Sequence, residues 1–382
     1  MSAGPLRVVH VSPRVQARGG IETLHDYHQR LPLPQTFVAF FDRRPTPRSG
    51  YINLDFNWRT SLWLMRRRFA RALATQAGSL VVYHNGWGLP LWHDLDAASR
   101  RAVFLHANPA YHAGDLAVQA GLIDWAAGVT PALRDAWNRV LPELTPARTV
   151  IVRAPVEAPP MPRGTRQPGE PIVLGCAGRI ERGQKRLDRL PALLRALEVA
   201  GLSFRFEALG DGALRVPLER KLGRQVRFHG WVPKQEFWRV LAGWDAIVFF
   251  TDFEGGAIAL FEAMALGVVP FWPAIGGSWG DVYVPQIDPR CYYPPRDMAA
   301  LAEAIQKVFQ SPPGRLDAMR AQARALVADH SSGAYEAACL AWLRTLMELP
   351  RISSARRRRP RLTDLLPLGL VTRLAPGALR LS

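Results

Sequence analysis

The most constraining stretch of this chain is an apolar run followed by a glycine pair, a helical segment and a second apolar run. Residues 246–250 are apolar throughout, which is typical of a strand buried on both faces of a sheet. Residues 257–266 are apolar on nearly every side, and Gly267 follows them. We expect a buried helix there, ended by Gly267, and a second strand at 268–271. Such a strand–helix–strand unit indicates a parallel sheet covered by helices.

Two glutamates lie in this otherwise apolar unit. Glu254 precedes the expected helix, and Glu262 lies within it. A carboxylate on a buried helix is costly unless a cation or a ligand pairs with it. We therefore expect a polar partner for Glu262, which is either a bound ligand or a buried salt bridge.

The same alternation of apolar runs and helical segments extends over most of the 382 residues, which is enough for two domains. Residues 154–171 are rich in Pro and Gly and lack periodicity, which is typical of a linker. We predict an α/β chain of two Rossmann-like, doubly wound domains that face a central cleft. The expected parts are an N-terminal domain (1–153), a C-terminal domain (172–330), a terminal helix (331–350) and a tail (351–382).

The pattern also gives the expected elements. Strands are predicted at 6–11, 37–41, 80–83, 103–105, 128–130, 150–152, 172–176, 204–209, 226–228, 246–250 and 268–271. Helices are predicted at 22–31, 62–76, 131–140, 187–200, 214–222, 234–242, 257–266, 298–310, 316–328 and 334–346. Ligands of doubly wound sheets bind at the carboxyl ends of the strands, so the cleft is the expected site.

The chain is strongly basic, with a formal net charge of +17. Such an excess indicates an anionic partner: a phosphorylated substrate, a membrane surface or a nucleic acid. Residues 351–382 contribute +7 of this charge and include four consecutive arginines, 356–359. This Leu-rich segment is broken by Pro and Gly, so it either lies on an anionic bilayer surface or stays solvated. Nucleic-acid binding is disfavoured because the cluster lacks interleaved aromatic residues.

The cysteines and the apolar runs indicate a cytoplasmic protein. The three cysteines show no disulfide or metal spacing, and we expect neither a signal peptide nor a membrane span. The tail leaves open a peripheral position on the inner face of the cell membrane. Asp94-Leu95-Asp96 could suggest a metal-binding acid pair, but an acidic turn at a helix start is the favoured interpretation. We expect no metal and no cofactor.

The start of the expected helix at 257–266 suits a nucleoside diphosphate. Such a ligand needs N–H donors and cations for its phosphates and a carboxylate for its ribose diol. Gly256, Ala257 and Ile258 offer free N–H groups at a helix N-terminus. Glu262 lies about one and a half turns further, roughly 6–9 Å along the axis, which matches the distance from a phosphate to a ribose.

Basic residues and a glycine supply further candidate phosphate ligands. Arg179 and Lys185 follow the strand expected at 172–176, and both side chains suit a diphosphate. Arg182 or Arg186 could share the role of Lys185. Gly20 lies between an expected strand and helix, where a glycine lets a phosphate approach the backbone, although such a glycine taken alone more often belongs to a plain turn.

Short motifs follow one another in a fixed order over most of residues 5–350. They are residues 18–22 (RGGIE), 80–85 (LVVYHN), 103–106 (VFLH), 178–186 (GRIERGQKR), 210–212 (GDG), 228–232 (FHGWV) and the run from Glu254 through Glu262 to Gly267. This ordered set resembles the signature of retaining family-4 glycosyltransferases of the GT-B fold, the bacterial group 1 glycosyltransferases.

The resemblance implies an activity, a role for each domain and a role for individual residues. It makes 1–153 the acceptor-side domain and 172–330 the nucleotide-sugar donor domain. It implies a hexosyltransferase-type enzyme that transfers a sugar from a nucleotide-diphosphate sugar to a hydroxyl of a glycan or lipid-linked glycan. It implies retention of anomeric configuration, no metal, and a place in lipopolysaccharide or other cell-surface polysaccharide synthesis. It directs His106 at the donor sugar in catalysis and assigns hydrogen bonds from the sugar hydroxyls to Glu254. His84 is a weaker candidate, for the acceptor pocket.

One departure from the family pattern and two alternative functions remain open. The family commonly has a Glu after the Gly276-Gly277 pair, whereas this chain has Ser-Trp-Gly followed by Asp281. Asp281 either substitutes for that Glu or serves another purpose. The alternatives are a nucleotide-sugar epimerase of the same fold and a non-catalytic, basic nucleic-acid-binding or scaffold protein.

Overall fold

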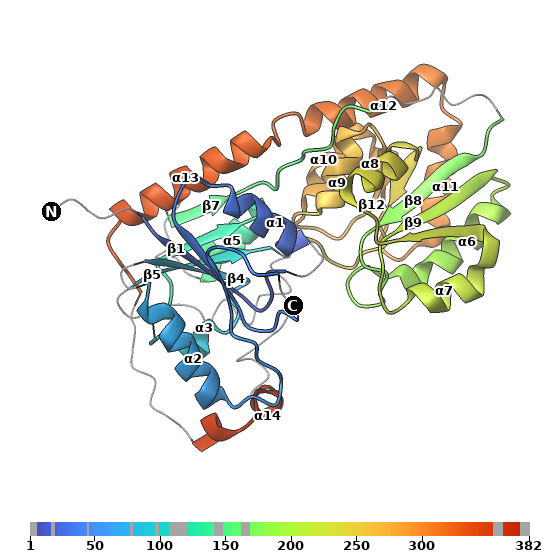
Figure 1. Ribbon diagram of the computed structural model, residues 1–382. Helices are drawn as coiled ribbons and strands as arrows, with labels where there is room; N and C mark the ends of the chain where they lie inside the picture. The colour runs from blue at the N-terminus through green and yellow to red at the C-terminus, as the bar shows by residue number, and fades with distance from the viewer. Residues whose placement is uncertain are drawn as a thin grey trace. The chain divides into compact units, whose positions relative to one another are not determined.

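A computed structural model describes residues 6–16, 20–43, 46–76, 79–95, 99–106, 121–140, 148–161, 169–353 and 362–374. The chain forms two compact units, shown with their elements in Figure 1. The first unit comprises Met1–Arg153 together with Glu336–Ser382, and the second comprises Ala154–Tyr335. The end of the chain therefore belongs to the same unit as its beginning.

The first unit contains a seven-stranded, wholly parallel sheet in the order β3-β2-β1-β4-β5-β6-β7. The chain builds outward from β1 to β3 and then returns to the other side of β1 with β4. The strand order therefore reverses between β1 and β4. The strands are β1 (Val8–Ser12), β2 (Gln35–Ala39), β3 (Tyr51–Asn53), β4 (Leu80–His84), β5 (Arg100–Leu105), β6 (Trp125–Gly128) and β7 (Thr149–Ile151).

Helices pack on this sheet through periodic apolar faces. The helix α2 (Leu62–Ala74) starts at Ser61, whose hydroxyl accepts a hydrogen bond from the backbone N–H of Leu64 at 3.4 Å. Its buried residues are Leu62, Met65, Phe69 and Leu73, which share one helical face. The other helical segments are α1 (Gly20–Gln29), α3 (Leu89–Trp92), α5 (Pro131–Val140), most of α13 (Ser332–Glu348), the 3-10 turn η5 (Leu362–Leu365) and α14 (Leu368–Leu374).

The second unit repeats this architecture with a six-stranded parallel sheet in the order β10-β9-β8-β11-β12-β13. Here the strand order reverses between β8 and β11. The strands are β8 (Ile172–Ala177), β9 (Phe204–Leu209), β10 (Val226–Gly230), β11 (Ala246–Val248), β12 (Val269–Pro273) and β13 (Tyr292–Tyr293).

Helices and 3-10 turns accompany these strands along the chain. Their alternation with the strands confirms the prediction of two doubly wound, parallel α/β halves. The elements are η2 (Leu187–Arg189), α6 (Leu190–Val199), α7 (Arg215–Leu222), η3 (Gly223–Gln225), α8 (Lys234–Ala242), α9 (Ile258–Ala265), α10 (Trp279–Ile287), η4 (Pro289–Cys291), α11 (Met298–Phe309) and α12 (Pro313–Leu326).

The strand–helix–strand unit predicted from the apolar pattern is β11–α9–β12. Leu260, Phe261 and Met264 of α9 are fully buried, as the apolar composition of the helix required. Gly267 ends the helix with a positive φ of 69°, and its N–H donates to the Met264 carbonyl at 2.9 Å. A left-handed glycine directly after a helix is a common way to satisfy its last carbonyls.

Several elements were not expected from the sequence. The strands β3 and β13 are short and lie at sheet edges, where the apolar pattern is weakest. The helix α10 contains Gly280 and Pro285, both of which disfavour a helix in sequence. Gly280 is required by packing, because a Cβ there would lie 2.1 Å from the Trp272 ring. Among the described residues, no helix combines the length and apolarity needed to cross a bilayer.

Candidate functional site

The second unit has a hollow where its strand order reverses. The hollow encloses about 310 Å³ including its open mouth, and residues at the carboxyl ends of β8, β9 and β11 surround it. This is the edge at which doubly wound sheets bind their ligands. The lining residues include Ala177, Gly178, Arg179, Lys185, Leu209 and Thr251.

Glycines let the loop after β8 lie close to the loop after β9. Gly210 has a φ of 118°, and a Cβ on it would lie 1.9 Å from the Gly178 carbonyl oxygen. Backbone hydrogen bonds join the two loops, from Ile180 N–H to the Asp211 carbonyl at 2.8 Å and from Leu214 N–H to the Ile180 carbonyl at 2.9 Å. We call residues 178–186 the basic loop; these contacts fix its first half.

The second half of the basic loop is attached to the segment that precedes α9. The Thr251 hydroxyl and the Asp252 N–H both donate to the Gln184 carbonyl, at 3.0 and 3.1 Å. The Gln184 amide donates to the Phe253 carbonyl at 3.0 Å. Two residues nominated from the sequence therefore meet, because the Lys185 ammonium forms a short ion pair with the Glu254 carboxylate.

The Lys185–Glu254 pair is largely withdrawn from water. The Glu254 side chain is 6% exposed and the Lys185 side chain 19%. Removing one partner of such a pair leaves an uncompensated buried charge, which typically costs about 3–5 kcal/mol. Each side chain therefore holds the other in place at the edge of the hollow.

Arg186 has structural partners, which argues against a role as a diphosphate ligand. Its guanidinium contacts Asp188 at 3.0 Å and Asp252 at 2.6 Å, and these hydrogen bonds raise its pKa. Arg189 binds the same Asp252 at 2.5 Å. Burial raises the pKa of Asp252, but the hydrogen bonds from Arg189 and Arg186 outweigh it and hold the pKa below its ordinary value. Asp252 thus fixes this side of the basic loop, a role not expected from the sequence.

Arg179 lies at the rim of the hollow. Its side chain is 49% exposed and donates to Glu181 at 3.1 Å and to Gln184 at 2.6 Å. Both partners belong to the basic loop, so an anionic ligand could replace them without disturbing the sheet. Arg182 is exposed on the same loop.

The start of α9 presents backbone donors beside the same segment. Ala257 is the N-cap residue, and no side chain caps the helix there. The N–H groups around Gly256, Ala257 and Ile258 therefore lie at a helix N-terminus that attracts anions.

Glu262 lies on the buried face of α9, 3% exposed. Its carboxylate accepts a hydrogen bond from the Trp238 indole at 2.9 Å and forms a short ion pair with Lys234. The salt bridge left open by the sequence is therefore present. Because the Lys234 side chain is 47% exposed, the carboxylate can exchange this partner for a ligand. Lys234 and Trp238 were missed, although their i, i+4 spacing on a predicted helix places them on one face.

Asp281 serves the fold of its own loop. Its carboxylate accepts from the N–H and hydroxyl of Ser278, at 2.9 and 2.6 Å, and from the Gly276 N–H at 2.9 Å. The Tyr292 hydroxyl donates to it at 2.9 Å. Asp281 thus caps α10, which agrees with the alternative that this residue serves another purpose.

In the first unit, the nominated residues lie at the corresponding edge of the sheet. Gly20 is the first residue of α1, after β1; its neighbours in the RGG motif, residues 18 and 19, lie outside the described residues. His106 follows β5 directly, and its backbone N–H donates to the Asn85 side chain at 2.8 Å. Its ring Nε2 lies 2.8 Å from Nδ1 of His84.

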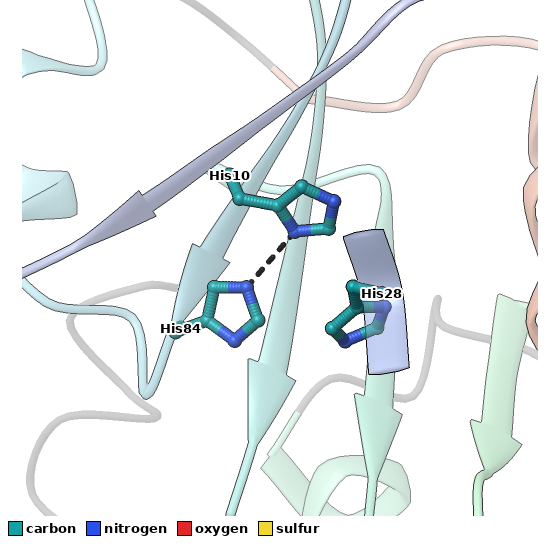
Figure 2. Close-up of side chains that lie close together, drawn as sticks. All are labelled: His10, His28 and His84. Atoms are coloured by element: carbon teal, nitrogen blue, oxygen red, sulfur yellow. Dashed lines mark hydrogen bonds between the residues drawn. The ribbon is translucent and has the colours of Figure 1, made fainter. Parts of the chain in front are cut away.

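A group of buried histidines extends inward from His106. His84 Nε2 lies 3.0 Å from His10 Nδ1, and His28 faces both rings, as Figure 2 shows. His25 packs edge-on against His84 at a ring distance of 4.5 Å. His84 is 1% exposed and has a histidine on each ring nitrogen, so it does not line an open acceptor pocket.

Burial keeps four of these histidines, His10, His25, His28 and His84, neutral. Desolvation lowers the pKa of His10 to about 4, against the hydrogen bond with Gln35, which raises it. Desolvation also holds the pKa values of His25, His28 and His84 well below the ordinary value of 6.5, and neighbouring histidines lower them further.

Metal-ligand geometry occurs once among the described acidic, histidine and cysteine side chains. Ring nitrogens of His10, His28 and His84 lie within 4.8 Å of one another. Asp94 belongs to no such group: its carboxylate binds Arg66 at 2.7 Å and is 8% exposed. It follows the helix α3 instead of opening one, so the predicted acidic turn at a helix start is wrong. Asp96 lies outside the described residues.

Comparisons with known proteins agree with this architecture. Residues 171–311 match the model of a family described as glycosyl transferases group 1. A glycogen synthase of Mycobacterium tuberculosis is 27% identical over 217 residues, covering 54% of this chain and 50% of that protein. This chain thus spans about half the length of the curated relatives it matches.

Solved structures resemble the whole chain. The apo lipopolysaccharide outer core galactosyltransferase WaaB is 16% identical with a TM-score of 0.65, over 89% of this chain and 99% of that one. A UDP-forming α,α-trehalose-phosphate synthase from Burkholderia vietnamiensis is 15% identical with a TM-score of 0.66, over 90% and 97%. Residues 171–311 thus resemble a group 1 glycosyltransferase domain, and the chain has the GT-B fold that the sequence predicted.

The buried histidines make stability depend on pH. Below about pH 6.5 the unfolded chain takes up protons on them, whereas the folded chain does so only at lower pH. The free energy of unfolding should therefore fall as the pH drops from 7 towards 5, by up to about 1.4 kcal/mol per pH unit and histidine. Urea unfolding at pH 7.5 and 5.5 measures this, and H28L should show a smaller difference between the two. Equal values at both pH values would contradict the neutral cluster.

Proposed function

We propose that this protein is a glycosyltransferase that moves a hexose from a nucleotide-diphosphate sugar to a hydroxyl of a glycan or lipid-linked glycan. The observation that carries the proposal is the arrangement around α9. Glu254, the uncapped helix start and Glu262 lie along one segment that follows β11, and Lys185 of the basic loop pairs with Glu254. All of them belong to the domain that matches group 1 glycosyltransferases.

The diphosphate would bind at the start of α9. The N–H groups near Gly256, Ala257 and Ile258 supply donors and the favourable end of the helix dipole. Lys185 and Arg179 supply positive charge, and each already holds an acidic or amide partner that a phosphate oxygen can replace. Gly20, at the start of α1, is proposed as a further backbone contact for phosphate.

The ribose would bind at Glu262. Glu262 lies four positions after Ile258 on the helix, a rise of about 6 Å at 1.5 Å per residue. Its carboxylate already accepts a hydrogen bond from Trp238 and forms an ion pair with Lys234. The carboxylate oxygens are therefore the acceptors that a vicinal diol needs. Trp238 would keep the carboxylate in place while Lys234, on the exposed side, exchanges with the ribose hydroxyls.

The chemistry rests on charge and position. The nucleoside diphosphate gains negative charge as the bond to the sugar breaks, and Arg179 and Lys185 would stabilise it. Once Lys185 turns to the phosphate, Glu254 becomes free to accept hydrogen bonds from sugar hydroxyls, which holds the sugar in place. The catalytic role of His106, retention of configuration and independence of metal rest on the sequence resemblance.

The acceptor class and location follow from the relatives and the charge. WaaB acts on the lipopolysaccharide outer core by its description, which supports an acceptor in lipopolysaccharide or other cell-surface polysaccharide synthesis. A nucleotide sugar is a cytoplasmic substrate, so the proposal places the protein in the cytoplasm, with contact to the inner face of the cell membrane.

The contact with the membrane would use a surface built by the tail. The segment that holds η5 and α14 pairs with the start of α2 through the Ser61–Pro367 bridge, and α14 lies beside α2 in Figure 1. These elements carry several exposed apolar side chains. The Gly369 N–H donates to the Trp58 carbonyl and the Leu368 N–H to the Thr60 carbonyl, both at 2.9 Å. We call these side chains the tail surface: Trp58 (45% exposed), Trp63 (48%), Leu362 (88%), Leu365 (64%) and Leu370 (45%).

The charge around the tail surface suits an anionic bilayer. The helix α2 has four arginines and no acid, and Arg67 and Arg71 are exposed. Arg67 stacks on the Trp63 ring with 5.4 Å between its guanidinium carbon and the ring centroid. Exposed tryptophans and leucines beside arginines are typical of surfaces that lie in the lipid headgroup region.

Nucleotide binding tests the proposed donor site. UDP, GDP, CDP and ADP are each added to the protein, and one of them should raise the melting temperature, because a ligand of the folded state stabilises it. E262Q should weaken the binding of that nucleotide at least tenfold, which corresponds to about 1.4 kcal/mol. E207Q is the matched control, since Glu207 also accepts from a tryptophan indole, at 3.1 Å from Trp244.

Two results would contradict the donor site. Either no nucleoside diphosphate changes the melting temperature, or E262Q binds the nucleotide as tightly as the parent and the E207Q control do. Formation of an epimerised sugar nucleotide without any acceptor would instead favour the epimerase. Binding of nucleic acid with no nucleotide binding would favour the non-catalytic alternative.

Vesicle sedimentation tests the tail surface. The full chain should bind vesicles containing phosphatidylglycerol and not those of phosphatidylcholine alone. The double variant W63S/L362S should reduce binding at least tenfold, because burying each large apolar side chain contributes about 1.5–3 kcal/mol. W231S is the matched control, since Trp231 is 40% exposed on the second unit. Unchanged binding of the double variant would leave the tail as a solvated segment.

A further inference from the structure

Five of the nine histidines of the chain lie together in the first unit. His10 lies on β1, His84 at the end of β4 and His106 directly after β5, so parallel neighbouring strands bring these three together. Nδ1 of His10 lies 3.0 Å from Nε2 of His84, and Nδ1 of His84 lies 2.8 Å from Nε2 of His106. The three rings therefore form one continuous hydrogen-bonded row.

Gln35 sets the direction of this row. Its side-chain amide nitrogen donates to the carbonyls of His28 and Leu31, at 2.5 and 3.4 Å. Its amide oxygen must then be the atom 3.0 Å from Nε2 of His10. An amide oxygen only accepts hydrogen bonds, so His10 carries its proton on Nε2.

The direction passes from ring to ring. A neutral imidazole has one N–H and one lone pair. Because His10 uses Nε2 as its donor, its Nδ1 accepts a hydrogen bond, and His84 must donate from Nε2. Nδ1 of His84 then accepts in turn, so His106 donates from Nε2.

We propose that Gln35, His10 and His84 are positioning residues that fix the tautomer of His106, with its proton on Nε2 and a lone pair on Nδ1. Stacking supports the orientation: the His106 ring lies nearly parallel to His84 and Phe104, at interplanar angles of 14°. In this tautomer, Nδ1 of His106 accepts a hydrogen bond or a proton from a hydroxyl. This role in transfer rests on the proposed glycosyltransferase function; the tautomer itself does not.

The row orients His106, but it does not transfer a proton from His106 to the buried rings of His84 and His10. A proton taken up on Nδ1 of His106 could reach His10 only by two successive N–H transfers, leaving a cation on His84 or His10. Both rings are 1% exposed, and burial disfavours their charged forms. At the end of the row the amide oxygen of Gln35 accepts a hydrogen bond from His10, but the proton is not transferred to it.

A metal ion is the competing use of the same nitrogens. His10, His28 and His84 could each offer one ligand atom (Figure 2). His10 Nδ1 and His84 Nε2 now share one proton in their hydrogen bond, so a metal bound through either of these two nitrogens would break the row. The two uses therefore exclude each other.

Histidine-selective ¹⁵N NMR of the full chain without substrate tests the proposal. Two-bond N–H couplings show which ring nitrogen carries the proton, and H10N, H84N and H106N variants assign the signals. All three histidines should carry the proton on Nε2. In Q35M the anchor is lost, and His106 should show a measurable fraction protonated on Nδ1. Q29M is the matched control, because Gln29 binds Arg48 at 3.0 Å and not the row.

The proposal is overturned if His106 in the parent carries its proton on Nδ1, or if Q35M leaves all three tautomers unchanged. It is also overturned if the purified protein holds one equivalent of zinc that H10N removes. Failure of the proposed function would appear separately, as absent nucleotide binding by the second unit while the tautomers are as expected.

Discussion

The buried carboxylates of Glu254 and Glu262 are the constraint on which the second unit depends. Both side chains are at most 6% exposed, on a segment whose other residues are almost all apolar. Each carboxylate has one lysine partner, Lys185 for Glu254 and Lys234 for Glu262. A buried ion pair is weak evidence for stability. In the proposed function, the two pairs are sites held ready for a ligand that replaces the lysine or joins it.

Because the two sheets share one topology, the candidate site residues of both lie at the carboxyl ends of the strands. In each unit the strand order reverses beside the first strand, and nominated residues follow the strands that meet there. In the second unit these residues form ion pairs around a hollow. In the first unit they form a row of hydrogen-bonded histidines, and one glutamine determines which ring nitrogen of each donates. The edge of the second sheet thus carries charged pairs, and the edge of the first sheet carries a directed row of hydrogen bonds.

The sequence predicted those parts whose signal is local. The β11–α9–β12 unit was recognisable because its apolar pattern and its glycines determine its form without help from distant residues. The helix α10 was not, since it depends on the cap from Asp281 and on the packing of Trp272 over Gly280. Partners that meet only through the fold were also missed. Lys234 is 28 residues from Glu262 in sequence, and His10 is buried in a strand that shows no sign of its neighbours.

A crystal structure of the protein with its preferred nucleoside diphosphate would test the central claim most directly. The Glu262 carboxylate should lie within about 2.6–3.0 Å of the ribose hydroxyls. The diphosphate should lie on the N–H groups at the start of α9, with Lys185 moved from Glu254 to a phosphate oxygen. A nucleotide bound elsewhere, with both lysine–glutamate pairs unchanged, would contradict it.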